Sequence, residues 1–198
     1  MHPSLVILFV GLLYLLGFRA LSYLRRQGMS PRFLIEGGIL TAAGALLTLA
    51  SVPLHPVLFL VLIYLITMRV RLLVDLGNWF SSRERYEQAL DVFRLALRLG
   101  VDPVSRQIVL INRGVTEFRA QALEEAYRTL EEALGAETTR PGAKYLAAGY
   151  YNWGLACRRT GREAQAVRHF NEAIDVLPNS IYAHAARQAL KKRKDDQT

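Results

Sequence analysis

The sequence of 198 residues has one cysteine and few lysines, and its first third has almost no acid. With Cys157 alone, a disulfide framework or a cysteine-based zinc site cannot form within one chain. Gly-rich phosphate-binding loops, metal-ligand clusters and nucleophile elbows are also missing from the sequence. We therefore predict a protein that is not an enzyme and that uses no metal and no cofactor.

Acidic residues are almost absent before residue 75, where Glu36 stands alone among basic residues. The basic residues of this stretch are Arg19, Arg25, Arg26, Arg32, Arg69 and Arg71. Beyond it, acids and bases nearly balance, although the chain carries a formal net charge of +8. We assign the excess charge mainly to arginines that flank apolar segments, and we do not expect a nucleic-acid partner.

Long apolar runs fill the first third and predict a membrane domain over residues 1–71, with spans at about 3–24, 33–51 and 54–71. Each span approaches the roughly 20 residues that cross a bilayer. Pro53 and Pro56 separate the second and third spans by a tight turn. We expect the first span to be retained, because its arginines follow the apolar core, whereas a cleaved signal carries positive charge before it.

The arginines also predict an orientation, because positive charge collects on the cytoplasmic side. The N-terminus and the proline-rich turn then face outward, and residues 72–198 lie in the cytoplasm, below the inner (cytoplasmic) membrane. Glu36 is expected near the interface, paired with Arg32 or a headgroup, and an intramembrane functional role stays open. His55, in the turn, is expected to face water.

Small residues in the second span, which let membrane helices approach closely, form a predicted packing face. Its members are Gly37, Gly38, Ala42 and Ala45. Two interpretations stay open: packing within this chain, or contact with a partner subunit.

From about residue 70, apolar and small residues recur at helical spacing in three similar units. The first unit has Leu76, Gly77, Phe80, Tyr86, Ala89, Phe93 and Ala96. The second has Gly114, Leu123, Ala126, Leu130 and Ala133, with Arg113 where an apolar residue is usual and no glycine at its turn. The third has Gly154, Gly161, Ala166, Phe170, Ala173 and Pro178.

These residues resemble the tetratricopeptide repeat family over about 70–180, whose unit is two antiparallel helices of roughly 34 residues. The resemblance implies an all-α solenoid, which here follows three N-terminal transmembrane helices and fills residues 72–198. Residues 180–194 are expected to cap the stack as a helix that Ser180 begins. Since glycine and proline are absent from 58–75, we predict one continuous helix over about 57–82.

By analogy with the family, exposed residues on the first helix of each unit, and on the cap, bind segments of other proteins. The candidates are Asn78, Val115, Phe118, Arg119, Tyr151, Leu155, Arg158, Arg159 and Lys192. Their positive charge favours partners with acidic segments. Cys157 is expected to be a buried structural thiol and His169 to be exposed, while the position of His184 stays open.

The predicted function is that of a membrane-anchored adaptor that binds partner segments in a groove along the repeats. The alternative is a structural or assembly subunit of a larger membrane complex, held through its transmembrane helices.

Overall fold

The computed structural model describes residues 2–24, 31–135 and 141–195, and the helices found there are α-helices without accompanying strands. They form two compact units, Met1–Leu72 and Leu73–Thr198. Arg25 and Arg26, on which the predicted orientation partly rests, lie outside the described residues. The all-helical prediction is confirmed.

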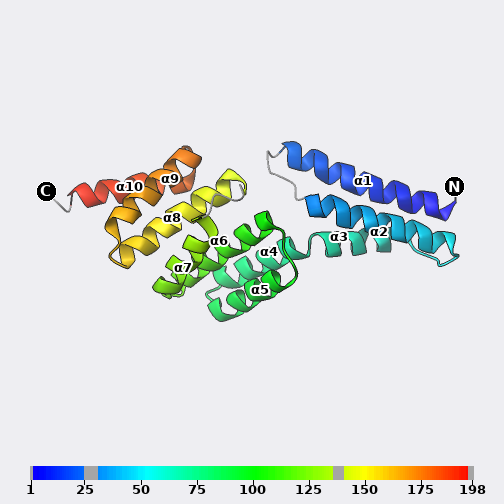
Figure 1. The fold of residues 1–198 in the computed structure, drawn as a ribbon, viewed down its shortest axis with the longest axis horizontal. Coiled ribbons are helices and arrows are strands. Elements are labelled where there is room, and N and C mark those ends of the chain that lie inside the picture. Colours follow the sequence, from blue (N-terminus) through cyan, green and yellow to red (C-terminus); the bar gives the residue numbers. More distant parts are fainter. Residues whose placement is uncertain (1, 25–30, 136–140, 196–198) are drawn as a thin grey trace. The chain divides into compact units, whose positions relative to one another are not determined.

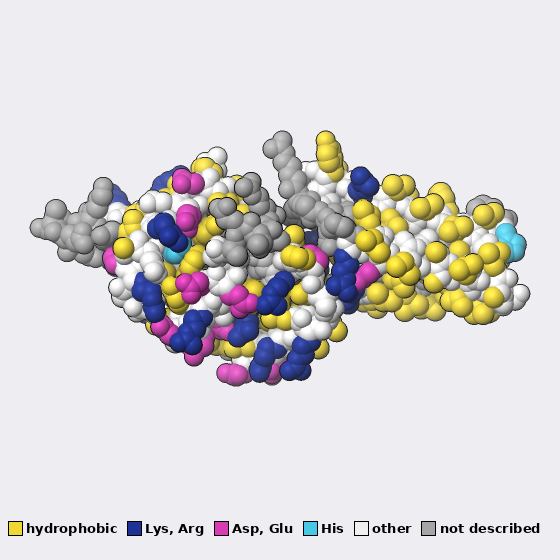
Figure 2. Space-filling view, in the orientation of Figure 1, with side chains coloured by type: hydrophobic (Ala, Val, Ile, Leu, Met, Phe, Trp, Pro, Cys, Tyr) yellow, Lys and Arg dark blue, Asp and Glu magenta, His cyan; other side chains and the backbone are white. Residues whose placement is uncertain are grey.

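The first unit contains three apolar helices, α1 (Pro3–Leu24), α2 (Pro31–Leu49) and α3 (Pro56–Thr67), which pack against one another (Figure 1). Its core is small and aromatic-rich, and large apolar side chains cover the outside (Figure 2). The core residues are Ile7, Tyr14, Phe33, Phe59 and Ile63. Two helices, Pro3–Leu24 and Arg32–Leu49, are long and apolar enough to cross a membrane.

The third predicted span has a different form, because α3 has 12 residues and extends only about 18 Å, against about 30 Å of bilayer hydrocarbon. It is followed by α4 (Arg69–Ser82) after a bend of 69°. Counting the bent pair as one candidate span, the described residues hold up to three. The prediction of one continuous helix over 57–82 is wrong, since the helix breaks at Met68.

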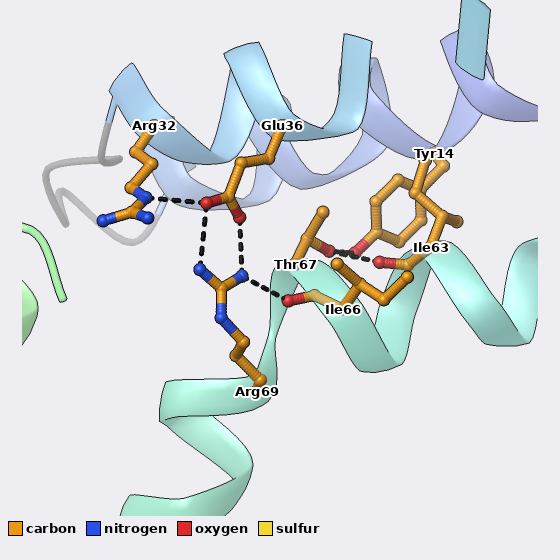
Figure 3. Close-up of polar contacts among 7 residues, drawn as sticks. All are labelled: Tyr14, Arg32, Glu36, Ile63, Ile66, Thr67 and Arg69. Atoms are coloured by element: carbon orange, nitrogen blue, oxygen red, sulfur yellow. Dashed lines mark hydrogen bonds and ion pairs between the residues drawn. The ribbon is translucent and has the colours of Figure 1, made fainter. Parts of the chain in front are cut away.

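Side chains explain this break, which no glycine or proline marks. The Thr67 hydroxyl donates to the Ile63 carbonyl at 2.6 Å, a back-bond that tends to bend helices. The Arg69 guanidinium donates to the Ile66 carbonyl, also at 2.6 Å, and so replaces a backbone donor (Figure 3). The same two side chains contact Tyr14 of α1 and Glu36 of α2, and sequence periodicity does not reveal such contacts.

The second unit continues with α5 (Tyr86–Arg98), α6 (Pro103–Arg119), α7 (Leu123–Leu134), α8 (Ala143–Arg159), α9 (Glu163–Val176) and α10 (Ile181–Asp195). Helices α6 and α7, then α8 and α9, form antiparallel pairs in which each pair packs on the next (Figure 1). Asp102 caps α6 by accepting from Val104 and Ser105 amides. Ser180 accepts from the Ala183 amide at 3.0 Å, as expected of the N-cap of α10.

In each pair, the turn between the two helices has a residue in the left-handed conformation at the same position. Only one of these three residues is glycine. The φ angles are +61° at Glu84, +64° at Gln121 and +79° at Gly161. Glycine adopts this conformation at the least cost, and other residues need support from the surrounding structure. The second unit, which lacks the expected glycine, therefore makes the same turn through Gln121.

Candidate protein-binding face of the repeats

A glycine on the first helix of each pair meets a large side chain on the second. A Cβ added to Gly77 would lie 2.5 Å from Phe93, and one added to Gly154 would lie 2.7 Å from Phe170. In the middle pair, a Cβ added to Gly114 would lie 2.6 Å from Leu130. Because the three crossings are equivalent, residues at equal distance from these glycines occupy equivalent positions on α4, α6 and α8.

The predicted binding residues fall on this common frame, which we call the first-helix face. One residue after each glycine stand Asn78, Val115 and Leu155, all half-buried. Five residues after it, Arg119 and Arg159 are exposed at the ends of α6 and α8. Helices α6 and α8 thus each present a half-buried apolar side chain and an exposed arginine at matching positions, and arginine is enriched among residues that dominate binding.

Two further candidates on α8 contact the terminal helix. Arg158 donates to the Ala189 carbonyl of α10 at 3.2 Å, and its guanidinium lies 4.8 Å from the Phe170 ring centre. Tyr151 lies with its ring centre 6.2 Å from that of Tyr182 on α10, and burial raises the pKa of its hydroxyl. Both residues therefore help to hold α10. Of the remaining candidates, Phe118 is half-buried on α6 and Lys192 is exposed on α10.

Two asparagines on the same face were not anticipated. Asn112 and Asn152 stand two residues before the crossing glycines of α6 and α8, and both are half-buried. Each side-chain amide donates to the carbonyl four residues earlier, at 2.7 and 2.8 Å respectively. Their repetition at the spacing of the glycines was a signal in the sequence that alignment on Gly114 and Gly154 would have found.

Arg113, which looked misplaced in the second unit, has a partner in the structure. Its guanidinium donates to the Glu117 carboxylate at 2.7 Å, and Glu117 is buried. The pair one turn apart on α6 thus replaces the usual apolar contact with an ion pair.

Cys157 is fully buried, as expected, and burial raises the pKa of its thiol to about 11. A thiol with so little thiolate at neutral pH is a poor nucleophile. The expectation for His169 is wrong, since this side chain is 1 % exposed and packs on Trp153. His184 and His55 are both exposed, and the ring of His55 caps α3 by accepting from the Val57 amide.

The predicted packing face of α2 divides into two sides. Gly37 and Ala45 are buried within the unit, and a Cβ on Gly37 would lie 2.5 Å from Leu15 of α1. Gly38 is partly exposed, Ala42 is exposed, and a Cβ on Gly38 would meet nothing within 4 Å. Within the described residues, the small residues thus serve packing in this chain on one side and lie uncovered on the other.

Glu36 forms the polar centre of the first unit (Figure 3). Its carboxylate accepts two hydrogen bonds from Arg69, at 2.6 and 2.9 Å, and one from Arg32 at 2.6 Å. The predicted pairing with Arg32 is present, and Arg69 is an additional partner from the bend after α3. The described residues hold no group of three or more histidines, cysteines or acids placed to bind a metal.

The chain is similar to known repeat-containing proteins. Residues 105–179 match the tetratricopeptide repeat family. Serine/threonine-protein phosphatase T of Trypanosoma brucei brucei (strain 927/4 GUTat10.1) is 28 % identical over 120 residues, which are 61 % of this chain and 23 % of that protein. Photosystem I assembly protein Ycf3 of Synechococcus sp. (strain CC9902) is 28 % identical over 97 residues, 48 % of this chain and 56 % of that protein.

The chain therefore spans less than two thirds of the length of either relative. The match begins within α6 and ends just after α9, so it covers the second and third helix pairs of the structure. The crossing glycines and left-handed turns of these pairs agree with it. Residues 105–179 thus match tetratricopeptide repeats both in sequence and in the geometry of their helix pairs.

Proposed function

We propose that this protein is a membrane-anchored adaptor whose first-helix face binds acidic segments of partner proteins. The observation that carries the proposal is the repetition of exposed Arg119 and Arg159 at one position of successive pairs, beside half-buried Val115 and Leu155. An extended or helical segment laid across α6 and α8 would bury its apolar side chains between the arginines and place its carboxylates against them.

The test uses the intact protein in mild detergent and replaces Arg119 and Arg159 together by glutamate. These residues suit the test better than Tyr151 and Arg158, which hold α10. The matched control replaces Arg98 and Arg128, exposed arginines on the second helices α5 and α7, so that the charge changes equally.

Quantitative mass spectrometry of the proteins that copurify gives the result. We expect loss of a defined set of companions with acidic segments in the first-helix variant and its retention in the control. If both variants lost the same companions, the cause would be the change in net charge and not the first-helix face. If both variants kept them, binding on this face would be contradicted.

We propose further that the first unit lies in the inner membrane with the repeats in the cytoplasm. Arg32 and Arg69 meet at Glu36, so the start of α2 and the end of α3 share one basic end of the unit. The exposed turn before α3, with Ser51 and His55, carries no arginine or lysine. Because positive charge collects on the cytoplasmic side, the arginines support placing the end with Arg32 and Arg69 on that side.

The buried single cysteine makes this orientation simple to test. Cysteine introduced at Ser51 should react with a membrane-impermeant maleimide in spheroplasts, and cysteine introduced at exposed Gln88 should react only after lysis. The reverse pattern would contradict the orientation.

An assembly subunit held through its membrane helices is the second candidate function. It is favoured by the uncovered side of α2, where Gly38 and Ala42 permit close approach of another helix. The similarity to a photosystem I assembly protein supports an assembly role in general terms. Isoleucine at both positions would then dissociate a membrane complex that the Arg119 and Arg159 variant leaves intact.

A further inference from the structure

A pocket lies on the second-helix side of the repeats, away from the residues of the first-helix face. Its volume is about 470 Å³, within the range of small-ligand sites. Helices α7, α8 and α9 each contribute to it. The lining side chains used below are Tyr127, Glu131, Trp153, Arg168 and His169.

Two of these lining residues each have a buried polar atom without a hydrogen-bond partner among the described residues. These atoms are the indole nitrogen Nε1 of Trp153 and the ring nitrogen Nε2 of His169. The side chains are only 4 % and 1 % exposed, and their rings stack with centres 3.6 Å apart. Buried polar atoms are almost always paired in proteins, so these two indicate a missing partner.

The hydrogen bonds of His169 determine what that partner must offer. Its Nδ1 lies 2.6 Å from the Glu172 carboxylate, which accepts, so the proton is on Nδ1. Burial lowers the pKa of His169 and keeps the ring neutral, which leaves Nε2 as an acceptor. Trp153 offers a donor. A ligand must therefore present an acceptor to Trp153 and a donor to His169, as an amide group does.

The charges around the pocket add a second requirement. Glu131 accepts a hydrogen bond from the Tyr127 hydroxyl at 2.8 Å but forms no ion pair with any described residue. The other charged lining residues have partners, since Glu132 pairs with Arg106 and Arg168 with Glu172. Glu131 is the acid of the pocket that remains available to a cation.

We propose that this pocket binds a peptide segment of a partner protein through one backbone amide and an adjacent basic side chain. The amide carbonyl accepts from Trp153 and the amide N–H donates to His169, while the cation pairs with Glu131. The site differs from the first-helix face in both location and charge, so the two faces select basic and acidic segments respectively.

The test follows the indole N–H resonance of Trp153 by NMR in the full chain in detergent micelles. Trp79, exposed on α4, is replaced by phenylalanine so that one indole remains. The probes are Nα-acetyl-argininamide, with amides and cation, Nα-acetyl-norleucinamide, with amides alone, and agmatine, without an amide. We expect a saturable shift with the first, binding about tenfold weaker for the second because one charged hydrogen bond is lost, and no comparable shift with agmatine.

Variants locate the binding groups. His169→Phe keeps the aromatic ring and removes the acceptor, so it should abolish the shift by argininamide. Glu131→Gln should remove the advantage of argininamide over norleucinamide, whereas Glu125→Gln, an exposed acid on the same helix, should leave it. A pocket that holds only water would show no shift with any probe, and stronger binding of agmatine than of both amides would equally overturn the proposal.

Discussion

The two units of this chain are built from similar helices with opposite arrangements of polarity. In the first, hydroxyls such as those of Thr41 and Thr48 are buried and back-bond to carbonyls, while leucines cover the outside. In the second, Phe93 and Phe170 are fully buried and charged residues cover the outside. The difference fits the proposed placement of the first unit in lipid and of the second in water.

The strongest way to break this comparison is to place charge on the exposed apolar surface of each unit. Aspartate at both Leu12 and Ile39, exposed near the middle of α1 and α2, should cost about 3 kcal/mol of membrane insertion per site. The protein should move from the carbonate-resistant membrane fraction to the soluble or degraded fraction. Leu95→Asp on α5, where an exposed leucine faces water, should change nothing, and a similar effect there would contradict the comparison.

Glycine at helix crossings is a feature the units share, and its substitution tests how tightly each is packed. Valine at Gly154 would push into Phe170 and should lower the free energy of unfolding by about 3 kcal/mol. Valine at Gly38, where the added atoms meet nothing within 4 Å, is the matched control. Thermal unfolding in detergent, followed by circular dichroism, measures both, and equal melting temperatures would refute the packing argument.

The ion pair of Glu36 sharpens the comparison, because it is the main charged contact of the apolar unit. Glu36→Gln removes the negative charge that pairs with Arg69 and Arg32 and should destabilise the first unit by about 2 kcal/mol. Adding Arg69→Gln should restore part of the loss, since the unpaired charge is removed as well. Arg19→Gln, at an exposed site, is the control for charge alone.

The smallest expected effect is a pH dependence confined to the second unit. Because burial lowers the folded-state pKa of His169 below its ordinary 6.5, the unfolded chain binds the proton more readily. Stability from this residue is present above about pH 6.5 and falls as the pH drops below it. The His169→Phe variant should lose that slope in urea unfolding between pH 7 and 5, and an unchanged slope would assign it to other groups.

Periodicity predicted the repeats well, because Gly77, Gly114 and Gly154 must face large side chains wherever two helices cross closely. It failed at Met68, where the Thr67 and Arg69 side chains bond to nearby carbonyls and also contact Tyr14 of α1 and Glu36 of α2. It also failed for His169, whose burial depends on stacking against Trp153 from the preceding helix. The pocket needed coordinates for the same reason, since α7, α8 and α9 each supply part of it.

The sequence predicted candidate binding residues by their position, and the structure adds which of these side chains contact other helices. Arg158 and Arg159 are adjacent in sequence and alike in type, yet one contacts α10 and the other is exposed. Adjacent residues of a helix point in directions about 100° apart, so α10 lies within reach of Arg158 and leaves Arg159 exposed.

The terminal helix has a consequence for how the molecule is made. Ala183 and Ala186 of α10 are fully buried, and Arg158 is tied to its backbone. A ribosome delivers these residues after the third helix pair, so the side of that pair that α10 covers stays open until α10 has emerged. A nascent chain stalled before residue 181 should therefore recruit chaperones that a chain extended past α10 does not.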